Sequence, residues 1–148
     1  MATVELSFTA LPAHVRTARL VATAVARRSG VDESLLDEVR LAVGEACSRA
    51  VEGHQLYCPG EPVRLALTDL AGRFEVEVTD TCAPSDRSPA GQGASSTVAR
   101  GLGAENNRSL PANLGIAVIA GLADDVQISE TATGTSIRMS WPSAGPSR

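Results

Sequence analysis

The segment LAVGEACSRAV, residues 41–51, decides the fold that the rest of the chain is expected to adopt. Apolar residues recur at helical spacing through this segment and before it, on one stripe made of Leu35, Val39, Ala42, Ala46 and Ala50. Glu45 and Arg49 stand one turn apart on a neighbouring stripe, so their side chains reach the same place. We therefore predict a long amphipathic helix that carries either a surface ion pair or part of a pocket.

The composition indicates one globular domain. The chain has 148 residues, of which 43% are hydrophobic and 20% charged, enough to bury an ordinary core. It has no apolar run that spans a bilayer and no basic-then-apolar leader, so we expect a cytoplasmic protein without a membrane partner. A net charge of -4 with scattered basic residues argues against direct binding of nucleic acid.

Three cysteines, odd in number and unevenly spaced, predict reduced thiols rather than a disulfide framework. Cys47, His54 and Cys58 have the chemistry of metal ligands, but no paired C-x-x-C motif accompanies them. We therefore expect no metal site, with buried thiols and a loop histidine instead.

The first third of the chain predicts a strand and two helices. Residues 4–9 alternate between apolar and polar, and Pro12 suits the first turn of a helix that ends near Gly30. Asp32 can cap the next helix, which is predicted to end at about residue 52.

A hairpin follows. Residues 63–68 and 73–79 alternate on either side of a turn at Ala71 and Gly72. Continuing the second alternation carries Asp80 to the core face, where a carboxylate is costly unless something binds it. Asp80 is thus a second polar residue predicted to point inward.

The last third combines an irregular stretch with a helix and a closing hairpin. Residues 82–111 lack a pattern and are predicted to be a lid or a disordered insert. Asn113 can cap a helix over residues 114–123, which is apolar nearly all round and expected to be well buried. Residues 125–131 and 135–141 form the hairpin, and the tail from residue 142 is expected to be frayed.

This order of elements predicts a two-layer α/β sandwich over residues 1–141, with helices on one face of a mixed, mostly antiparallel sheet.

Four segments in this order resemble the anti-sigma-factor branch (RsbW-like proteins) of the GHKL ATPase superfamily, which has the histidine-kinase-type Bergerat fold. Residues 41–47 resemble its N box and residues 76–80 the strand that leads to its G1 box. Residues 114–116 with 122–126 resemble the G2 region, and residues 134–137 the last glycine box. The resemblance covers nearly the whole chain.

The resemblance implies an anti-sigma factor, commonly a homodimer, that sequesters a sigma factor until an unphosphorylated STAS-domain anti-anti-sigma protein displaces it. In active members, ATP and Mg²⁺ also support phosphorylation of a serine on that antagonist. Relatives use an arginine that matches Arg19 to grip both partners, with Arg16 as a possible helper; otherwise both are solvated helix charges.

The resemblance also implies the residues of a ligand pocket, which are Glu45, Arg49, Asp80, Asn113, Gly115 and Thr135. Glu45 matches the catalytic base of relatives, and Asp80 matches the aspartate that binds the adenine amino group. The alternatives are an ordinary surface ion pair between Glu45 and Arg49, worth roughly 0.2–0.5 kcal/mol, and a loop-capping role for Asp80.

Several positions depart from the family's motifs. Arg49 stands where an asparagine ligates Mg²⁺, and a guanidinium has no lone pair to offer a cation and would lower the basicity of Glu45. Cys82 and Pro84 replace the two G1 glycines, and Asn113 replaces the first glycine of the G2 pair. These departures predict that ATP and Mg²⁺ are not normal cofactors and that no catalytic residue remains.

Three hypotheses follow: an anti-sigma factor whose kinase activity is lost, an active serine kinase that phosphorylates the antagonist, and a sensor of an anionic metabolite such as a sugar phosphate or nucleotide. In the third, Arg49 takes the place of the metal as counter-charge, because a guanidinium binds phosphate well.

Overall fold

The computed structural model of the protein describes residues 2–82, 112–131 and 134–144. Its elements follow the predicted order: β1 (Ala2–Phe8), α1 (Pro12–Arg28), α2 (Glu33–Tyr57), β2 (Val63–Leu70), β3 (Arg73–Asp80), α4 (Ala112–Leu122), β4 (Asp125–Thr131) and β5 (Gly134–Pro142). The predicted lid lies almost wholly outside the described residues.

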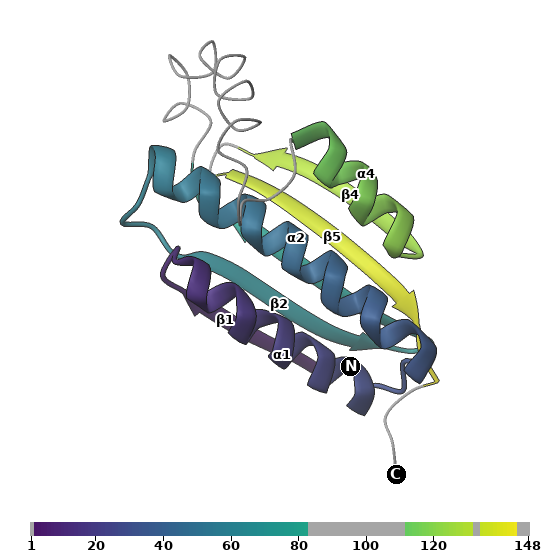
Figure 1. Ribbon diagram of the computed structural model, residues 1–148. Coiled ribbons are helices and arrows are strands. Elements are labelled where there is room, and N and C mark those ends of the chain that lie inside the picture. Colours follow the sequence, from purple (N-terminus) through teal and green to yellow (C-terminus); the bar gives the residue numbers. More distant parts are fainter. Residues whose placement is uncertain (1, 83–111, 132–133, 145–148) are drawn as a thin grey trace.

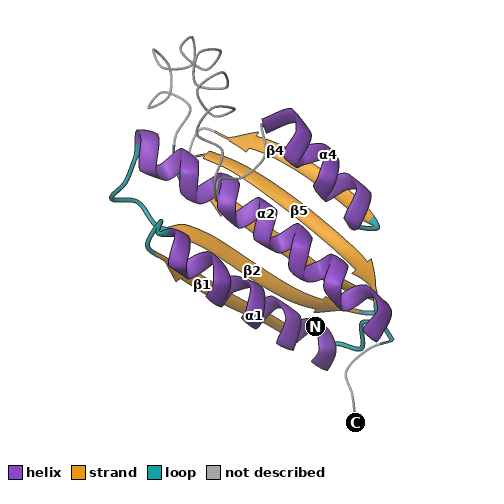
Figure 2. Ribbon diagram, viewed as in Figure 1, coloured by secondary structure: helices purple, strands orange, loops and turns teal. Residues whose placement is uncertain are grey.

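The molecule has two layers, a five-stranded sheet and a layer of helices on one of its faces (Figures 1 and 2). The strand order is β1-β2-β3-β5-β4, and each of the four neighbouring pairs is antiparallel. The predicted sandwich is confirmed, but the sheet is antiparallel throughout and not mixed. None of the described helices is long and apolar enough to cross a membrane.

Local chemistry explains where the first two helices begin and end. Pro12 is the first residue of α1, and Gly30, with φ of 90°, ends its last turn. Asp32 caps α2 by accepting a hydrogen bond from the Ser34 N–H at 2.9 Å. That bond and a second from the Ser34 hydroxyl lower the pKa of Asp32.

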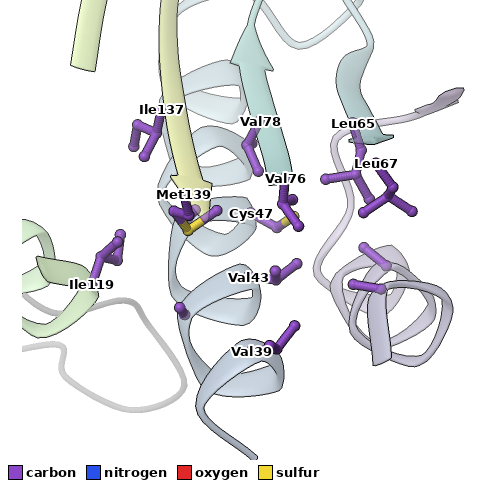
Figure 3. Close-up of a cluster of buried hydrophobic side chains, with 14 of the residues drawn as sticks. Val39, Val43, Cys47, Leu65, Leu67, Val76, Val78, Ile119, Ile137 and Met139 are labelled. Carbon is purple, nitrogen blue, oxygen red and sulfur yellow. The ribbon is translucent and has the colours of Figure 1, made fainter. Parts of the chain in front are cut away.

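Helix α2 is the centre of the core. It lies between α1 and α4 over the middle of the sheet, and Figure 3 shows Val39, Val43 and Cys47 on its inner face beside sheet residues such as Val76 and Met139. The buried stripe continues through Val51 and His54, so the helix ends at Tyr57, five residues beyond the predicted end. The helix is longer than predicted because buried residues continue at helical spacing as far as His54.

The β2–β3 hairpin agrees with its predicted alternation. Leu65 pairs with Val78 and Leu67 with Val76, and these four side chains are buried against the helices. Gly72, with φ of 74°, makes the turn.

Helix α4 differs from the prediction in its start and its burial. It begins at Ala112, so Asn113 lies within its first turn and is not the residue before the helix. From residue 114 onward only Gly115 and Ile119 are buried, and Leu114 is 49% exposed. The helix lies at one side of the helical layer, so a single face contacts α2, and the prediction of a well-buried helix was wrong (Figure 1).

The first part of the tail is held by backbone hydrogen bonds. Pro142 ends β5, the Ser143 N–H donates to the Gly72 carbonyl at 3.1 Å, and the Ala144 N–H donates to the Gly30 carbonyl at 2.9 Å. The predicted fraying from residue 142 is therefore wrong for residues 142–144.

Cys58 and Cys82 form a disulfide, with Cα atoms 5.8 Å apart, which corrects the prediction of three reduced thiols. Cys58 follows the end of α2, and Cys82 follows the end of β3. The fold brings these two ends together, which spacing along the chain does not reveal. Cys47 is a free, buried thiol.

Reducing the disulfide is expected to lower the free energy of unfolding by about 3 kcal/mol, because the bond closes a loop between residues 24 positions apart. Urea unfolding with and without dithiothreitol measures the change, and a Cys58→Ser, Cys82→Ser variant is the control that should not respond. Thiol titration of the denatured, unreduced protein should find Cys47 alone; three thiols would contradict the disulfide.

Candidate functional site

A cavity of about 270 Å³ lies between α2, α4 and the strands β3, β4 and β5. Its walls combine six apolar residues with four polar side chains, which come from three strands and one helix. The lining residues are Ala46, Arg49, Ala50, Val78, Asp80, Ile116, Ile128, Glu130, Thr135 and Ile137. A pocket in which several polar groups converge among apolar side chains is a candidate small-molecule site.

The fold brings together three of the residues predicted for the pocket. Arg49 comes from α2, while Asp80 at the end of β3 and Thr135 near the start of β5 are register partners. Asp80 is only 8% exposed and shares the inward face with Val76 and Val78, as its alternation predicted.

Hydrogen bonds fix the end of β3 where Asp80 enters the cavity. Asp80 Oδ1 accepts from the Cys82 N–H at 2.7 Å, and the Thr81 hydroxyl donates to the Pro62 carbonyl at 2.7 Å. The disulfide from Cys82 to Cys58 anchors the same three residues. Asp80 therefore has a defined position at the floor of the site.

His54 supports this floor from α2 and is wholly buried, so it is not the loop histidine that the sequence suggested. Its Nδ1 lies 2.8 Å from the Glu61 carbonyl, and its Nε2 lies 3.0 Å from the Thr81 N–H. Nδ1 must donate and Nε2 must accept, which defines a neutral ring. Nε2 therefore carries no proton toward Asp80, whose Oδ1 is 3.4 Å away.

Gly115 allows α4 to approach the helix that carries Glu45 and Arg49. A Cβ atom at Gly115 would lie 2.6 Å from Glu45 Oε2 and 3.2 Å from Arg49 Cδ, so a side chain there would require Glu45 to move. Glu45 and Arg49 are both half-buried beneath this point. The predicted pair is therefore located under α4 and beside the cavity rather than on an open helix surface.

Glu130 is the polar lining residue that the sequence analysis missed. It follows Val126 and Ile128 on the same face of β4, so its alternation matches that of Asp80 on β3. That alternation was the feature of the sequence from which the inward direction of Glu130 could have been predicted. Ile128 and Glu130 form one side of the cavity because β4 is the strand beyond β5.

Arg19 does not line this cavity. Its side chain lies across α2 at Gly44, where a Cβ atom would be 2.6 Å from Arg19 Cδ. Arg16 is exposed one turn earlier on α1. The two predicted partner-binding arginines are thus on α1 and are not among the residues that line the cavity.

Two predicted site positions cannot be placed. Pro84 lies outside the described residues, and of Asn113 only the backbone is described. Among the side chains that are described, none form a group of three or more His, Cys, Asp or Glu able to hold a metal ion.

The Cys47 thiol is buried on α2 and is not among the residues that line the cavity. Burial raises its pKa to about 12, against a smaller lowering by the Arg19 charge. The thiol is therefore neutral at physiological pH and a poor nucleophile.

We expect native Cys47 to resist alkylation by iodoacetamide at pH 8 and to react at once after unfolding. Because the pKa rises from 9.0 to about 12 on folding, this thiol favours the folded state below pH 9 and loses that contribution as pH rises toward 12. Mass spectrometry of the labelled protein measures the reaction. Rapid labelling of folded protein at pH 8 would contradict the burial.

The protein is thus a two-layer α/β sandwich, with helices on one face of an antiparallel sheet and a cavity between the central helix and the sheet. The chain belongs to the histidine kinase-like ATPase domain family, which matches residues 8–141. Its fold is also similar to the crystal structure of the RsbU and RsbW domains of Rv1364c from Mycobacterium tuberculosis, with a TM-score of 0.66 and 18% identity. That match covers 100% of this chain and 34% of the other, so the chain spans about a third of the length of the chain it matches. A comparison with curated proteins finds no match.

Proposed function

We propose that the protein is a partner-switching regulator, an anti-sigma factor that sequesters a sigma factor and releases it when a STAS-domain antagonist takes its place. Membership of the histidine kinase-like ATPase family and the likeness in fold to a structure that contains an RsbW domain support the proposal. The single observation that carries it is the position of Arg19, a half-buried cation laid over Gly44 of α2 and not among the residues that line the cavity.

The surroundings of Arg19 suit a partner that combines a carboxylate with apolar side chains. Leu20 follows it on α1 and is 58% exposed, and Leu41, one turn before Gly44 on α2, is 54% exposed. Arginine beside exposed leucine is a composition typical of binding surfaces, because the guanidinium gives direction and the leucine gives buried area. Two partners that need the same arginine exclude each other, which is the requirement for partner switching.

The cavity supports the second part of the proposal, that phosphate transfer to the antagonist is lost. A Mg²⁺ site needs oxygen ligands, whereas Arg49 brings to the cavity wall a permanent positive charge that would repel a cation. Glu45 Oε2 and Arg49 Cδ both lie within 3.2 Å of one point beside Gly115. A guanidinium near a carboxylate favours the ionised form of the carboxylate and reduces its strength as a base, which would weaken Glu45 in the role of a catalytic base.

Competition binding tests the regulatory function. Sigma factors and STAS-domain proteins from the same organism are purified singly and titrated against the labelled protein. We expect one sigma factor to bind and one STAS-domain protein to displace it, with no ternary complex. Absence of binding to every sigma factor, or simultaneous binding of both partners, would overturn the proposal.

A separate assay tests the loss of kinase activity. The protein is incubated with γ-labelled ATP, Mg²⁺ and the STAS-domain protein that displaces the sigma factor. We expect no labelled serine, and an active relative serves as positive control. Mg²⁺-dependent labelling would show that the active-kinase hypothesis is right while leaving partner switching intact.

Arg49 also favours a second candidate function, the binding of an anionic metabolite, because a guanidinium that lines a cavity suits a phosphate group. A ligand present at 100 times its Kd would stabilise the fold by about 2.7 kcal/mol. We expect a rise in Tm with one of ATP, ADP, inorganic phosphate or a sugar phosphate, lost in Arg49→Ala. Arg64→Ala, on the other face of the sheet, should keep it; no shift in the panel would exclude this function.

A further inference from the structure

The side chain of Arg19 lies directly on the backbone of Gly44. A Cβ atom built on Gly44 has three nearest neighbours, all from Arg19: Cδ at 2.6 Å, Cγ at 3.2 Å and Nε at 3.4 Å. Cβ atoms in proteins essentially never approach another heavy atom within 3.0 Å. The stem of the arginine therefore fills the space that any other residue at position 44 would need.

Nothing in the backbone of α2 requires a glycine there. Gly44 lies in the interior of the helix and is absent from the described glycines with positive φ, which are Gly30, Gly72 and Gly134. Glycine is the weakest helix former after proline, so its place in the middle of a 25-residue helix is unfavourable for the helix alone. The close contact with Arg19 accounts for the presence of a glycine at position 44.

A second observation places the charge of Arg19 near the same turn of α2. The positive charge acts on the buried thiol of Cys47, three residues after Gly44, and opposes the effect of burial on its pKa. The arginine is thus laid across α2 and is only half-exposed, unlike Arg16 on the same helix. A long side chain held in this way loses less conformational freedom when a partner binds.

We propose that Gly44 is a positioning residue, which seats the stem of Arg19 so that its guanidinium is presented to the carboxylate of a partner. The inference rests on the proposed function, because the partner is the one that Arg19 would bind. It adds that a residue on α2 with no side chain of its own sets the affinity.

The test compares Gly44→Ala, Arg19→Ala and the double variant. We expect Gly44→Ala to weaken sigma-factor capture about tenfold, since a misplaced arginine loses much of its binding energy. In the Arg19→Ala background the same substitution should change the Kd less than about twofold, because coupled residues are not additive. Thermal unfolding of each variant confirms that the domain remains folded.

Gly121→Ala is the matched control. Gly121 is also a helical glycine, on α4, but a Cβ atom there meets nothing within 4 Å. The same substitution should leave capture unchanged. A side-chain NMR readout is independent of any partner: the Nε–H resonance of Arg19, identified by its loss in Arg19→Ala, should shift in Gly44→Ala and stay in place in Gly121→Ala.

The outcomes separate the two ideas. If Arg19→Ala weakens capture while Gly44→Ala changes neither capture nor the Arg19 resonance, the seat is wrong and the proposed function stands. If Arg19→Ala leaves capture unchanged, Arg19 is outside the interface, and both the positioning role and the proposed site of binding are overturned.

Discussion

Gly134→Ala is expected to destabilise the protein by about 3–5 kcal/mol, the largest effect on stability that we anticipate from any single methyl group. Gly134 has φ of 151°, which residues with a side chain rarely adopt. A Cβ atom there would overlap the Asp80 carbonyl oxygen and lie 2.8 Å from its carbon. Relief requires β5 to move away from the end of β3, which also displaces Asp80 and Thr135 from the cavity.

Urea unfolding at a fixed protein concentration measures this effect, with Gly72→Ala as the control. Gly72 also has positive φ, at 74°, but nothing lies within 4 Å of a Cβ atom there. Its substitution should cost only about 1 kcal/mol, the price of the backbone conformation alone. Equal losses in the two variants would show that the contact with Asp80 is not the cause.

Arg19→Glu is expected to weaken capture of the sigma factor about a hundredfold or more, the largest effect on binding. The substitution removes the guanidinium and sets a like charge against the carboxylate proposed for the partner. Fluorescence titration at several salt concentrations measures the Kd. High salt should reduce the difference between wild type and variant, because ions screen the repulsion between exposed charges.

Arg28→Glu is the control for the change in net charge. Arg28 is an exposed arginine in the last turn of the same helix, nine residues and half a rotation away from Arg19. It should leave capture within about twofold of the wild type, since long-range charge effects are weak beyond a Debye length. Equal weakening by both variants would mean that net charge, not a specific contact, governs binding.

The periodic parts of the chain were predicted well because their signal is local. The alternation from Arg73 to Asp80 gave both the bounds of β3 and the inward direction of its aspartate. The prediction was wrong for α4, where the burial of a helix had to be inferred from its apolar pattern alone. The apolar sequence of α4 predicted a covered helix, but its place at one side of the layer leaves Leu114 half-exposed.

The candidate site was predicted only in part, since it joins residues from five elements. The resemblance to a family selected Arg49, Asp80 and Thr135, and these three do line one cavity. Glu130 follows the same alternation as Asp80, but the sequence did not predict which strands would be neighbours in the sheet. The strand order, with β5 between β3 and β4, is what brings its carboxylate to the site.

The sequence by itself determined the order of the elements, the inward faces of the strands and the two-layer class, because each depends on neighbours within a few residues. The tertiary structure decided which distant residues meet. It joined Cys58 to Cys82, placed His54 under Asp80, and laid Arg19 on the bare backbone of Gly44. Such contacts depend on strand register and helix packing, which the spacing of residues along the chain does not reveal.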